Sequence, residues 1–456
     1  MIVALFGTLL GVLSLGLLAS PWPFLAPLAL LGLAGLAVLL RRPAWGAVGL
    51  LALVPFEDLV SEGALSLPKL VGGAMLAALA LRLVVRRTPL RDLRSNLWRL
   101  LVLFLLCTAL SLLYSERPAA SLGNLRELFI GMALLPITLL ALRDFDLFWL
   151  CRLVVLGVAT TCLLSLLTKS HEVGGRAIGL LSDANYFALL IAVALPLAIL
   201  LLLHERQPVV RLLWVLCLVL LGIGLVKTDS RSGLIVAVAT LLIGLWHHRP
   251  RLRQVRPRHF GFILLGAAVL LATAVIVLPD AYLQRIASLS SLGEGINPQE
   301  DPSLGRRASY VVVGEAMIAA KPWFGSGPGT FPYHYAQTGY ASAYSMGLEA
   351  PDLYRRAHNT YLELFSEFGV PGGLLFLGLL AKALYNYYQA GALRTRRGQG
   401  RQADLAVHLG LSLLTVGLFM AFLSIPNHKY FWALLALSSI VRDAAERAPA
   451  ATGGPA

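Results

Sequence analysis

Long, uninterrupted apolar runs most narrowly restrict what this chain can fold into. A helix needs about 20 mostly apolar residues to cross a bilayer, and only helices or closed barrels satisfy their backbone groups there. The runs in this chain are continuous, whereas the strands of a membrane barrel alternate apolar and polar residues. We therefore expect an all-α polytopic membrane protein with about 12–14 transmembrane helices.

The runs predict spans in about fourteen places, two of them short enough to be re-entrant or interfacial. The short ones are 44–56 and 430–442. The first run, 2–19, lacks a basic start and leads into another apolar run, so we expect a helical hairpin rather than a cleaved signal peptide. The remaining spans are predicted near 24–40, 69–85, 97–114, 124–142, 147–167, 184–203, 209–226, 232–246, 260–278, 359–390 and 405–425.

The composition excludes a soluble globule. Of the 456 residues, 57% are hydrophobic and 14% are charged, whereas soluble domains carry about 25% charged residues.

All the cysteines lie in apolar runs without CxxC spacing, so we expect buried thiols rather than disulfides or metal ligands. They are Cys107, Cys151, Cys162 and Cys217.

Basic residues indicate the orientation, because loops rich in lysine and arginine stay on the cytoplasmic side. With a cytoplasmic N-terminus, every basic loop falls on that side, and the C-terminus does too. We therefore interpret the net charge of +14 as a topology signal of a multi-pass inner-membrane protein, and we expect no nucleic-acid partner. The basic loops are Arg41–Arg42, Arg86 to Arg94, Arg143, Arg249 to Arg258 and Arg394 to Arg401.

This topology leaves one long segment on the periplasmic side, 279–357. Its glycine, proline, serine and tyrosine content predicts a loop with short helices rather than an independent domain. We expect five parts: N-terminal transmembrane helices, central transmembrane helices with short periplasmic arginine loops, the long loop, C-terminal transmembrane helices and a disordered tail. Their residues are 1–143, 144–278, 279–357, 358–442 and 443–456.

Four arginines stand out on the predicted periplasmic side, against the usual bias. Arg176 precedes an apolar helix, Arg231 lies in a tight link between spans, and Arg306 and Arg307 begin an amphipathic stretch. Each alone could snorkel to the interface or cap a helix, and Asp229 could pair with Arg231. Together they suit a diphosphate attached to a lipid, since guanidinium groups bind phosphate bidentately and stay charged.

His358 lies where the long loop returns to the membrane. A lone histidine is more often structural than catalytic. The neighbouring Arg355 and Arg356 would, however, lower the pKa of His358 and favour its neutral imidazole. A neutral imidazole suits a general base, so His358 is the predicted catalytic residue.

Other motifs predict little chemistry. The glycine-rich segment 325–329 has no preceding strand and no following Gly-Lys-Ser/Thr, so we interpret it as a turn, with a phosphate cradle as the minor alternative. No HExxH motif, acidic pair of metal-ligand type or cysteine cluster occurs. We therefore expect no metal and no cofactor at the site.

The segments that carry the four arginines and His358 resemble the O-antigen ligase/polymerase superfamily of bacterial membrane glycosyltransferases. Their order, spacing and common membrane face carry the resemblance over residues 170–380, whereas the first 140 residues match only as generic spans. The matching segments are Gly175-Arg176 with Asp183-Ala184-Asn185, Thr228-Asp229-Ser230-Arg231-Ser232, Gly305 to Tyr310, Lys321 to Phe331, and His358 to Gly372.

The resemblance implies about twelve to fourteen helices, a long periplasmic loop covering a cavity, and metal-independent transfer with inversion. It implies that Arg231 and Arg306 bind the diphosphate of the donor, that Arg176 is a further recurrent arginine, and that His358 is essential. The chain departs from the family pattern by doubling the loop arginine, which leaves Arg306 and Arg307 as alternatives for one role.

The implied function is periplasmic transfer of a glycan from undecaprenyl diphosphate to lipid A-core, as an O-antigen ligase performs it. Three alternatives stay open, one of them a non-catalytic assembly protein. A polymerase of the same superfamily would use a second lipid-linked glycan as acceptor, and a transporter would move the lipid-linked glycan across the membrane. Transporters tend to place charges midway along spans, whereas the charges here gather at one face.

Overall fold

The computed structural model describes residues 37–58, 67–168, 172–173, 175–252, 302–344 and 353–448, with isolated residues between 11 and 35. The predicted span 260–278 and most of the spans 2–19 and 24–40 lie outside these residues, so those spans remain predictions.

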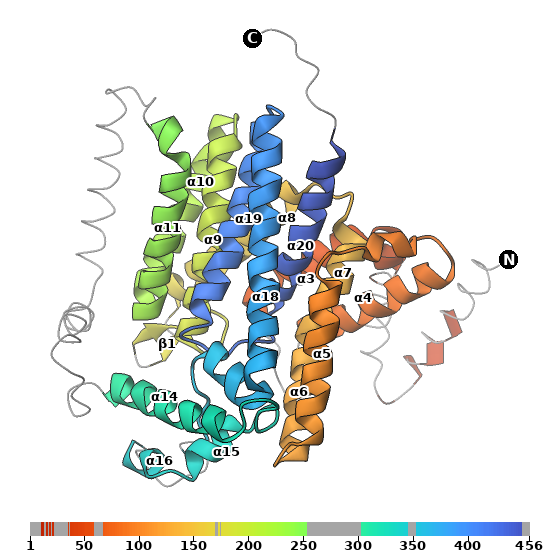
Figure 1. Ribbon diagram of the computed structural model, residues 1–456. Coiled ribbons are helices and arrows are strands. Elements are labelled where there is room, and N and C mark those ends of the chain that lie inside the picture. The colour runs from red at the N-terminus through yellow and green to blue at the C-terminus, as the bar shows by residue number, and fades with distance from the viewer. Residues whose placement is uncertain are drawn as a thin grey trace.

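A bundle of long helices forms the body of the protein (Figure 1). Among the described helices that are long and apolar enough to cross a membrane, α9 is the most enclosed, since 78% of its most apolar 18-residue stretch is buried. The corresponding fraction is 28% in α10 and in α11, which present apolar surface outward. Helices that are apolar on every side are stable in lipid, as the composition predicts. The helices are α8 (Leu147–Leu167), α9 (Ala184–His204), α10 (Pro208–Lys227), α11 (Arg231–Leu252), α18 (Thr360–Arg396), α19 (Gly400–Phe419) and α20 (Lys429–Arg447).

The predicted all-α polytopic class is confirmed. Within the described residues, seven helices are long and apolar enough to cross a membrane, and α6 and α7 together form one of them. The predicted spans 44–56 and 97–114 correspond to shorter apolar helices. The predicted boundary at residue 442 is wrong, because α20 continues to Arg447.

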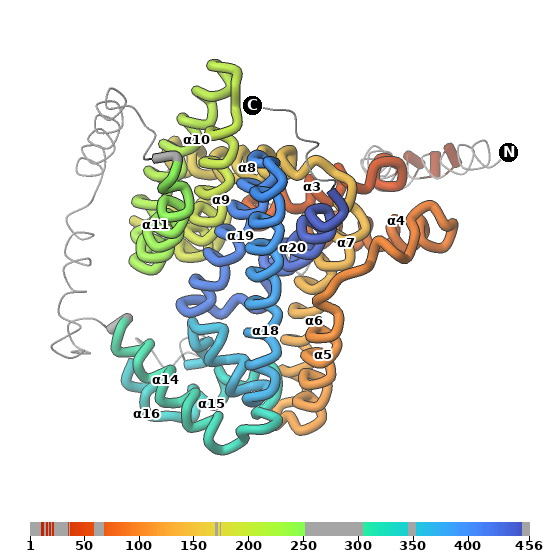
Figure 2. Tube along the Cα trace, turned by 45° about the horizontal axis from the view of Figure 1, so that its top comes forward, coloured from red at the N-terminus to blue at the C-terminus, as the bar shows by residue number. Residues whose placement is uncertain are grey.

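The N-terminal elements pack along one side of the bundle, and α4 projects away from it (Figures 1 and 2). Many of its leucines and valines are exposed, as expected of a surface facing lipid. These elements are α3 (Pro43–Ala52), η1 (Val54–Phe56), α4 (Leu67–Val84), η2 (Leu90–Leu93), α5 (Trp98–Leu113), α6 (Pro118–Met132) and α7 (Leu134–Leu142).

Short elements form a layer across one end of the bundle (Figure 1). The described part of the long loop folds into helices around a small aromatic core that includes Tyr310, Phe331 and Tyr335. Helices α15 and α16 are short, whereas α14 has 19 residues. A two-stranded antiparallel hairpin lies at the same end. The elements are α14 (Pro302–Ala320), α15 (Phe331–Ala336), α16 (Gly339–Ala343), β1 (Glu172–Val173) and β2 (Arg176–Ala177).

Helix α18 bends where it passes from this layer into the bundle. Gly369 has φ 73° and ψ 175°, and Pro371 follows it. A Cβ atom at Gly369 would lie 2.5 Å from the carbonyl oxygen of Trp323, so only glycine fits this approach. The bend lets Val370 N donate to the carbonyl oxygen of Pro322 over 2.8 Å, which joins the layer to the bundle.

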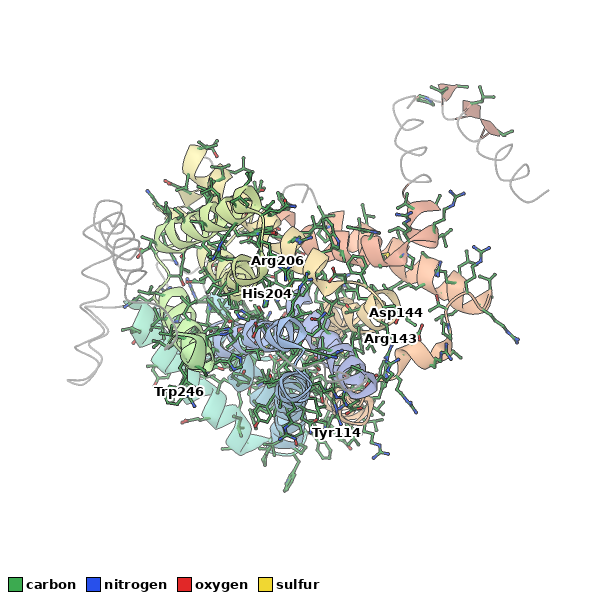
Figure 3. All side chains as sticks on the ribbon, turned by 90° about the horizontal axis from the view of Figure 1, so that it is seen from above. Tyr114, Arg143, Asp144, His204, Arg206 and Trp246 are labelled. Carbon is green, nitrogen blue, oxygen red and sulfur yellow. The ribbon has the colours of Figure 1, made fainter. Side chains whose placement is uncertain are left out.

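Basic loops gather at the opposite end, onto which Figure 3 looks. Arg143 forms an ion pair with Asp443 over 2.8 Å, and it donates to the carbonyl oxygen of Asp92 over 3.0 Å. The connection between α9 and α10, with His204 and Arg206, lies at the same end. The basic residues Arg143 and Arg394 therefore lie at the same end, next to Asp443 and Ala444, while the assignment of this end to the cytoplasm stays a prediction.

Candidate functional site

His358 lies at the layered end of the bundle, two residues before α18 begins. Its backbone has φ 48°, a left-handed conformation that a residue other than glycine holds only when its surroundings impose it. Its ring stacks on Tyr310 of α14, with 6.2 Å between centroids and 26° between planes. The layer therefore supports the imidazole from the side of α14.

Glu363, one turn into α18, holds the residues that precede His358. Its carboxylate is 2% exposed and accepts from Arg356 Nη2 over 2.7 Å, from Ala357 N over 2.9 Å and from Ser424 Oγ over 2.6 Å. A buried carboxylate needs such donors, because an unpaired buried charge is costly. Glu363 thus fixes the backbone that carries His358.

Thr360 ties the start of α18 to the connection between α19 and α20. Its backbone N–H donates to the carbonyl oxygens of Met420 and Leu423 over 2.7 and 3.0 Å. Its hydroxyl donates to Leu423 over 2.6 Å and accepts from Ile425 N over 2.9 Å. Asn359 caps the helix by accepting from Leu362 N over 3.1 Å. His358 is therefore held by contacts from α14, α18 and the α19–α20 connection.

A cavity of about 450 Å³ opens beside His358. Its wall combines arginine and histidine side chains with three carboxylates, those of the adjacent Glu57 and Asp58 and that of Asp183 at the N-cap of α9. Such a mixture can bind both a charged and a hydroxyl-rich ligand. The lining residues are Glu57, Asp58, Leu181, Ser182, Asp183, Tyr186, Arg355, Arg356, His358, Leu423, Ser424 and Ile425.

Burial lowers the pKa of His358, and the charge of Arg307 lowers it further. Asp183 and Glu363 act in the opposite direction, and Arg356 makes a smaller lowering contribution. The predicted direction of the shift is confirmed. Its main causes are burial and an arginine of α14, which lies far from His358 in the sequence, rather than the adjacent arginines.

Arg176 joins three elements at the edge of the site. Its Nε donates to the carbonyl oxygen of Thr228 over 2.9 Å, and its Nη2 donates to Asn185 Oδ1 over 3.2 Å. Ser230 Oγ donates to the same Asn185 oxygen over 2.8 Å. Asp183 caps α9 by accepting from the backbone N–H groups of Asn185 and Tyr186 over 2.8 and 2.9 Å. Arg176 thus holds the α10–α11 turn against the start of α9, and it does not line the cavity.

Arg231 is the first residue of α11 and follows the left-handed Asp229, whose φ is 49°. The turn is stabilised by Ser230 Oγ, which accepts from Gly233 N over 3.1 Å. The turn is linked through Asn185 to Asp183 in the cavity wall. Pairing between Asp229 and Arg231 remains one interpretation of this turn, and diphosphate binding remains the other.

The charges of the two loop arginines act on overlapping parts of the site. Burial raises the pKa of both Tyr310 and Tyr335, and the charge of Arg306 opposes this at both rings. The charge of Arg307 is felt at Tyr310 and also at His358. Of the pair, Arg307 is the one whose charge is among the main influences on the pKa of His358.

The glycine-rich segment 325–329 is a turn, as predicted. Gly325, Gly327 and Gly329 all have positive φ values, of 67°, 107° and 70°. Glu367 of α18 accepts from Gly329 N over 2.8 Å and from Phe331 N over 3.1 Å. The phosphate-cradle alternative is wrong for these two amides, because a carboxylate of the chain already binds them.

Four acidic side chains in or near the site were not predicted from the sequence. Glu57 and Asp58 reach the cavity wall from the segment after η1, and Glu57 also forms an ion pair with Lys429. Two acids directly after an apolar run were a signal that could have been noticed. Glu363 and Glu367 lay inside the resembling segment without an assigned role.

Within the part of the chain that the structure describes, the only cluster of three or more metal-ligating side chains lies away from this cavity.

Residues 216–377 match the sequence model of the family described as O-antigen ligase. The matched segment includes Arg231, Arg306, Arg307 and His358, while Arg176 lies before it. No curated protein matches the chain significantly.

Proposed function

We propose that this chain, which carries an O-antigen ligase domain over residues 216–377, transfers a glycan from undecaprenyl diphosphate to an acceptor on the periplasmic face of the bacterial inner membrane. The domain belongs to a family of membrane glycan transferases of the O-antigen ligase and polymerase type. The observation that carries the proposal is a cavity whose wall includes His358, Arg355 and Arg356, three residues of the matched segment.

In the proposed reaction, an acceptor hydroxyl attacks the anomeric carbon of the donor sugar. A new glycosidic C–O bond forms, the bond from that carbon to the diphosphate breaks, and the hydroxyl proton passes to His358. The lowered pKa of His358 keeps the imidazole neutral at pH 7 and able to accept this proton. Asp183 and Glu363, whose charges raise that pKa, stabilise the imidazolium once it has formed.

The leaving lipid diphosphate gains negative charge as the bond breaks, and fixed cations at that point lower the barrier. Arg355 lines the cavity, and the charge of Arg307 lowers the pKa of His358, which indicates that Arg307 lies near it. We therefore propose that Arg355 and Arg307 bind the diphosphate. Arg231 and Arg306, which the resemblance implies as diphosphate contacts, remain proposed contacts of the donor. Arg356 is bound to Glu363, which assigns it to positioning instead.

A single displacement by the acceptor, without a covalent glycosyl intermediate on the protein, inverts the anomeric configuration. We propose this course because a base and a cluster of cations suffice for it, and the activated donor supplies the driving force. Metal-independent transfer is part of the same proposal.

Lipid A-core is the proposed acceptor, and a second lipid-linked glycan, as used by a polymerase, is the alternative. The lipopolysaccharide gel pattern of a deletion strain distinguishes them. Loss of every capped rung supports the ligase, whereas a single retained rung supports the polymerase. An unchanged pattern would contradict both and point to another acceptor.

The test of transfer itself uses purified protein in detergent with an undecaprenyl-diphosphate glycan and a lipid A-core acceptor. We expect joint formation of the glycosylated acceptor and release of undecaprenyl diphosphate. A transporter would release no lipid diphosphate, and movement of the donor across vesicles without any product would overturn the proposal.

A further inference from the structure

A second cluster of polar side chains lies at the end of the bundle opposite His358. One donor atom each from His247, His248 and Asp404 lies within 4.8 Å of the other two. The histidines belong to the last turns of α11, close to the labelled Trp246 in Figure 3, and Asp404 belongs to the first turns of α19. Imidazole and carboxylate groups are common ligands of divalent transition metals.

Asp404 is 3% exposed, and a charge buried in this way needs a compensating partner. Its Oδ2 accepts from Nε2 of His204, the last residue of α9, over 2.8 Å. This bond requires the proton of His204 to lie on Nε2 when the imidazole is neutral. A carboxylate that is oriented by a histidine on one oxygen can present the other oxygen to an ion.

A relay of hydrogen bonds orients His248 in the same way. His408 Nδ1 lies 2.6 Å from the carbonyl oxygen of Pro196 and must donate, because a carbonyl only accepts. A neutral His408 therefore has its lone pair on Nε2, which lies 2.9 Å from Nε2 of His248. His248 then donates from Nε2, so the lone pair of its neutral ring lies on Nδ1. This pattern is the one that orients metal-binding histidines in proteins.

We infer that His247, His248 and Asp404 bind a divalent metal ion of the zinc class, with His204 and His408 as positioning residues. Ligand atoms about 2.0–2.2 Å from a tetrahedral zinc ion lie about 3.4 Å from one another, so donor atoms that now lie within 4.8 Å of one another need to move closer together. His247 is exposed and can make most of this movement. Three protein ligands leave a fourth position for water.

The ion would connect the end of α11 to α19, and through His204 to α9. Helix α11 is one of the least enclosed helices of the bundle, because only 28% of its most apolar 18-residue stretch is buried. A metal bond at the end of α11 would therefore hold this helix against the bundle. Its other end begins with Arg231. The role is therefore structural, it lies outside the proposed transfer site, and it does not depend on the proposed function.

Metal binding is tested on the full chain, purified in detergent with a tag that contains no histidine, stripped with EDTA and equilibrated with Co²⁺ or Zn²⁺. We expect one ion per chain at micromolar or lower concentration. Bound Co²⁺ should show the visible absorption of a four-coordinate site and should be displaced by Zn²⁺.

Variants locate the ion. The double variant His247→Gln/His248→Gln should lose it, and the exposed single variant His247→Gln, which should not disturb folding, should bind at least tenfold more weakly. His408→Gln and His204→Gln should weaken binding about 10–100-fold while keeping one ion per chain. His334→Gln, at the other end of the bundle, is the matched control and should bind like wild type.

Three results would overturn the site: less than one tenth of an ion per chain in the wild type, binding only at millimolar concentration, or full occupancy in the double variant. Any of them would assign the cluster to a metal-free hydrogen-bond network.

Discussion

Replacing Glu363 by glutamine perturbs the site without touching the reacting groups. The carboxylate accepts from Arg356, Ala357 and Ser424, and glutamine offers a single oxygen and an NH₂ group that faces donors. Loss of a hydrogen bond to a charged group costs about 1.5–3 kcal/mol. The same bonds support the left-handed backbone of His358, a conformation that costs about 1–3 kcal/mol.

If the cost of one charged hydrogen bond appears in the transition state, transfer falls roughly ten- to hundredfold, since each 1.36 kcal/mol is about tenfold in rate. The pH profile carries a more specific sign. The charge of Glu363 raises the pKa of His358, so its removal lowers that pKa. The acidic limb of the rate profile, where His358 becomes protonated, should therefore move to lower pH in Glu363→Gln.

The assay measures release of undecaprenyl diphosphate against pH for the wild type and the variant. Glu446→Gln is the matched control, because Glu446 forms an exposed ion pair with Arg442 at the other end of the bundle, and such pairs contribute little. Wild-type rate together with an unmoved acidic limb in Glu363→Gln would refute the positioning of His358 by this carboxylate. A lower rate with an unmoved limb would show general destabilisation and would refute the electrostatic part.

Four further predictions test the site and the topology. His358→Gln should abolish transfer and keep donor binding, and the wild-type rate should fall on acidification; an active variant that retains the acidic limb would show that another group is the base. Arg307→Ala should reduce transfer at least tenfold and more than Arg306→Ala, with partial rescue by lysine, since a charged hydrogen bond to phosphate is worth about 1.5–3 kcal/mol; equal effects would remove the distinction between them. Gln337→Cys should react with impermeant thiol reagents from the periplasm and Gln402→Cys should not, since both side chains are exposed at opposite ends of the bundle; the reverse pattern would invert the orientation. EDTA should leave the initial transfer rate unchanged within about twofold, and the His247→Gln/His248→Gln variant should show whether any loss arises at the second cluster or at the transfer site.

Much of the architecture could be predicted from the sequence, because it depends on local properties. The length of an apolar run decides whether a helix can cross a bilayer, and the charge of a short loop biases its side. Both are read from neighbouring residues, so α8, α9 and α10 appear close to their predicted bounds. The place of His358 at the start of a span was predictable for the same reason.

Only the tertiary structure decided which groups meet. Ser424 reaches Glu363 from 61 residues away, Gly329 reaches Glu367 across 38, and His204 pairs with Asp404 across 200. The sequence left Arg306 and Arg307 equivalent, whereas packing of α14 against the start of α18 brings the charge of Arg307 to bear on His358. These contacts depend on how helices pack and bend, as at Gly369, and that arrangement has no signature in the spacing of residues along the chain.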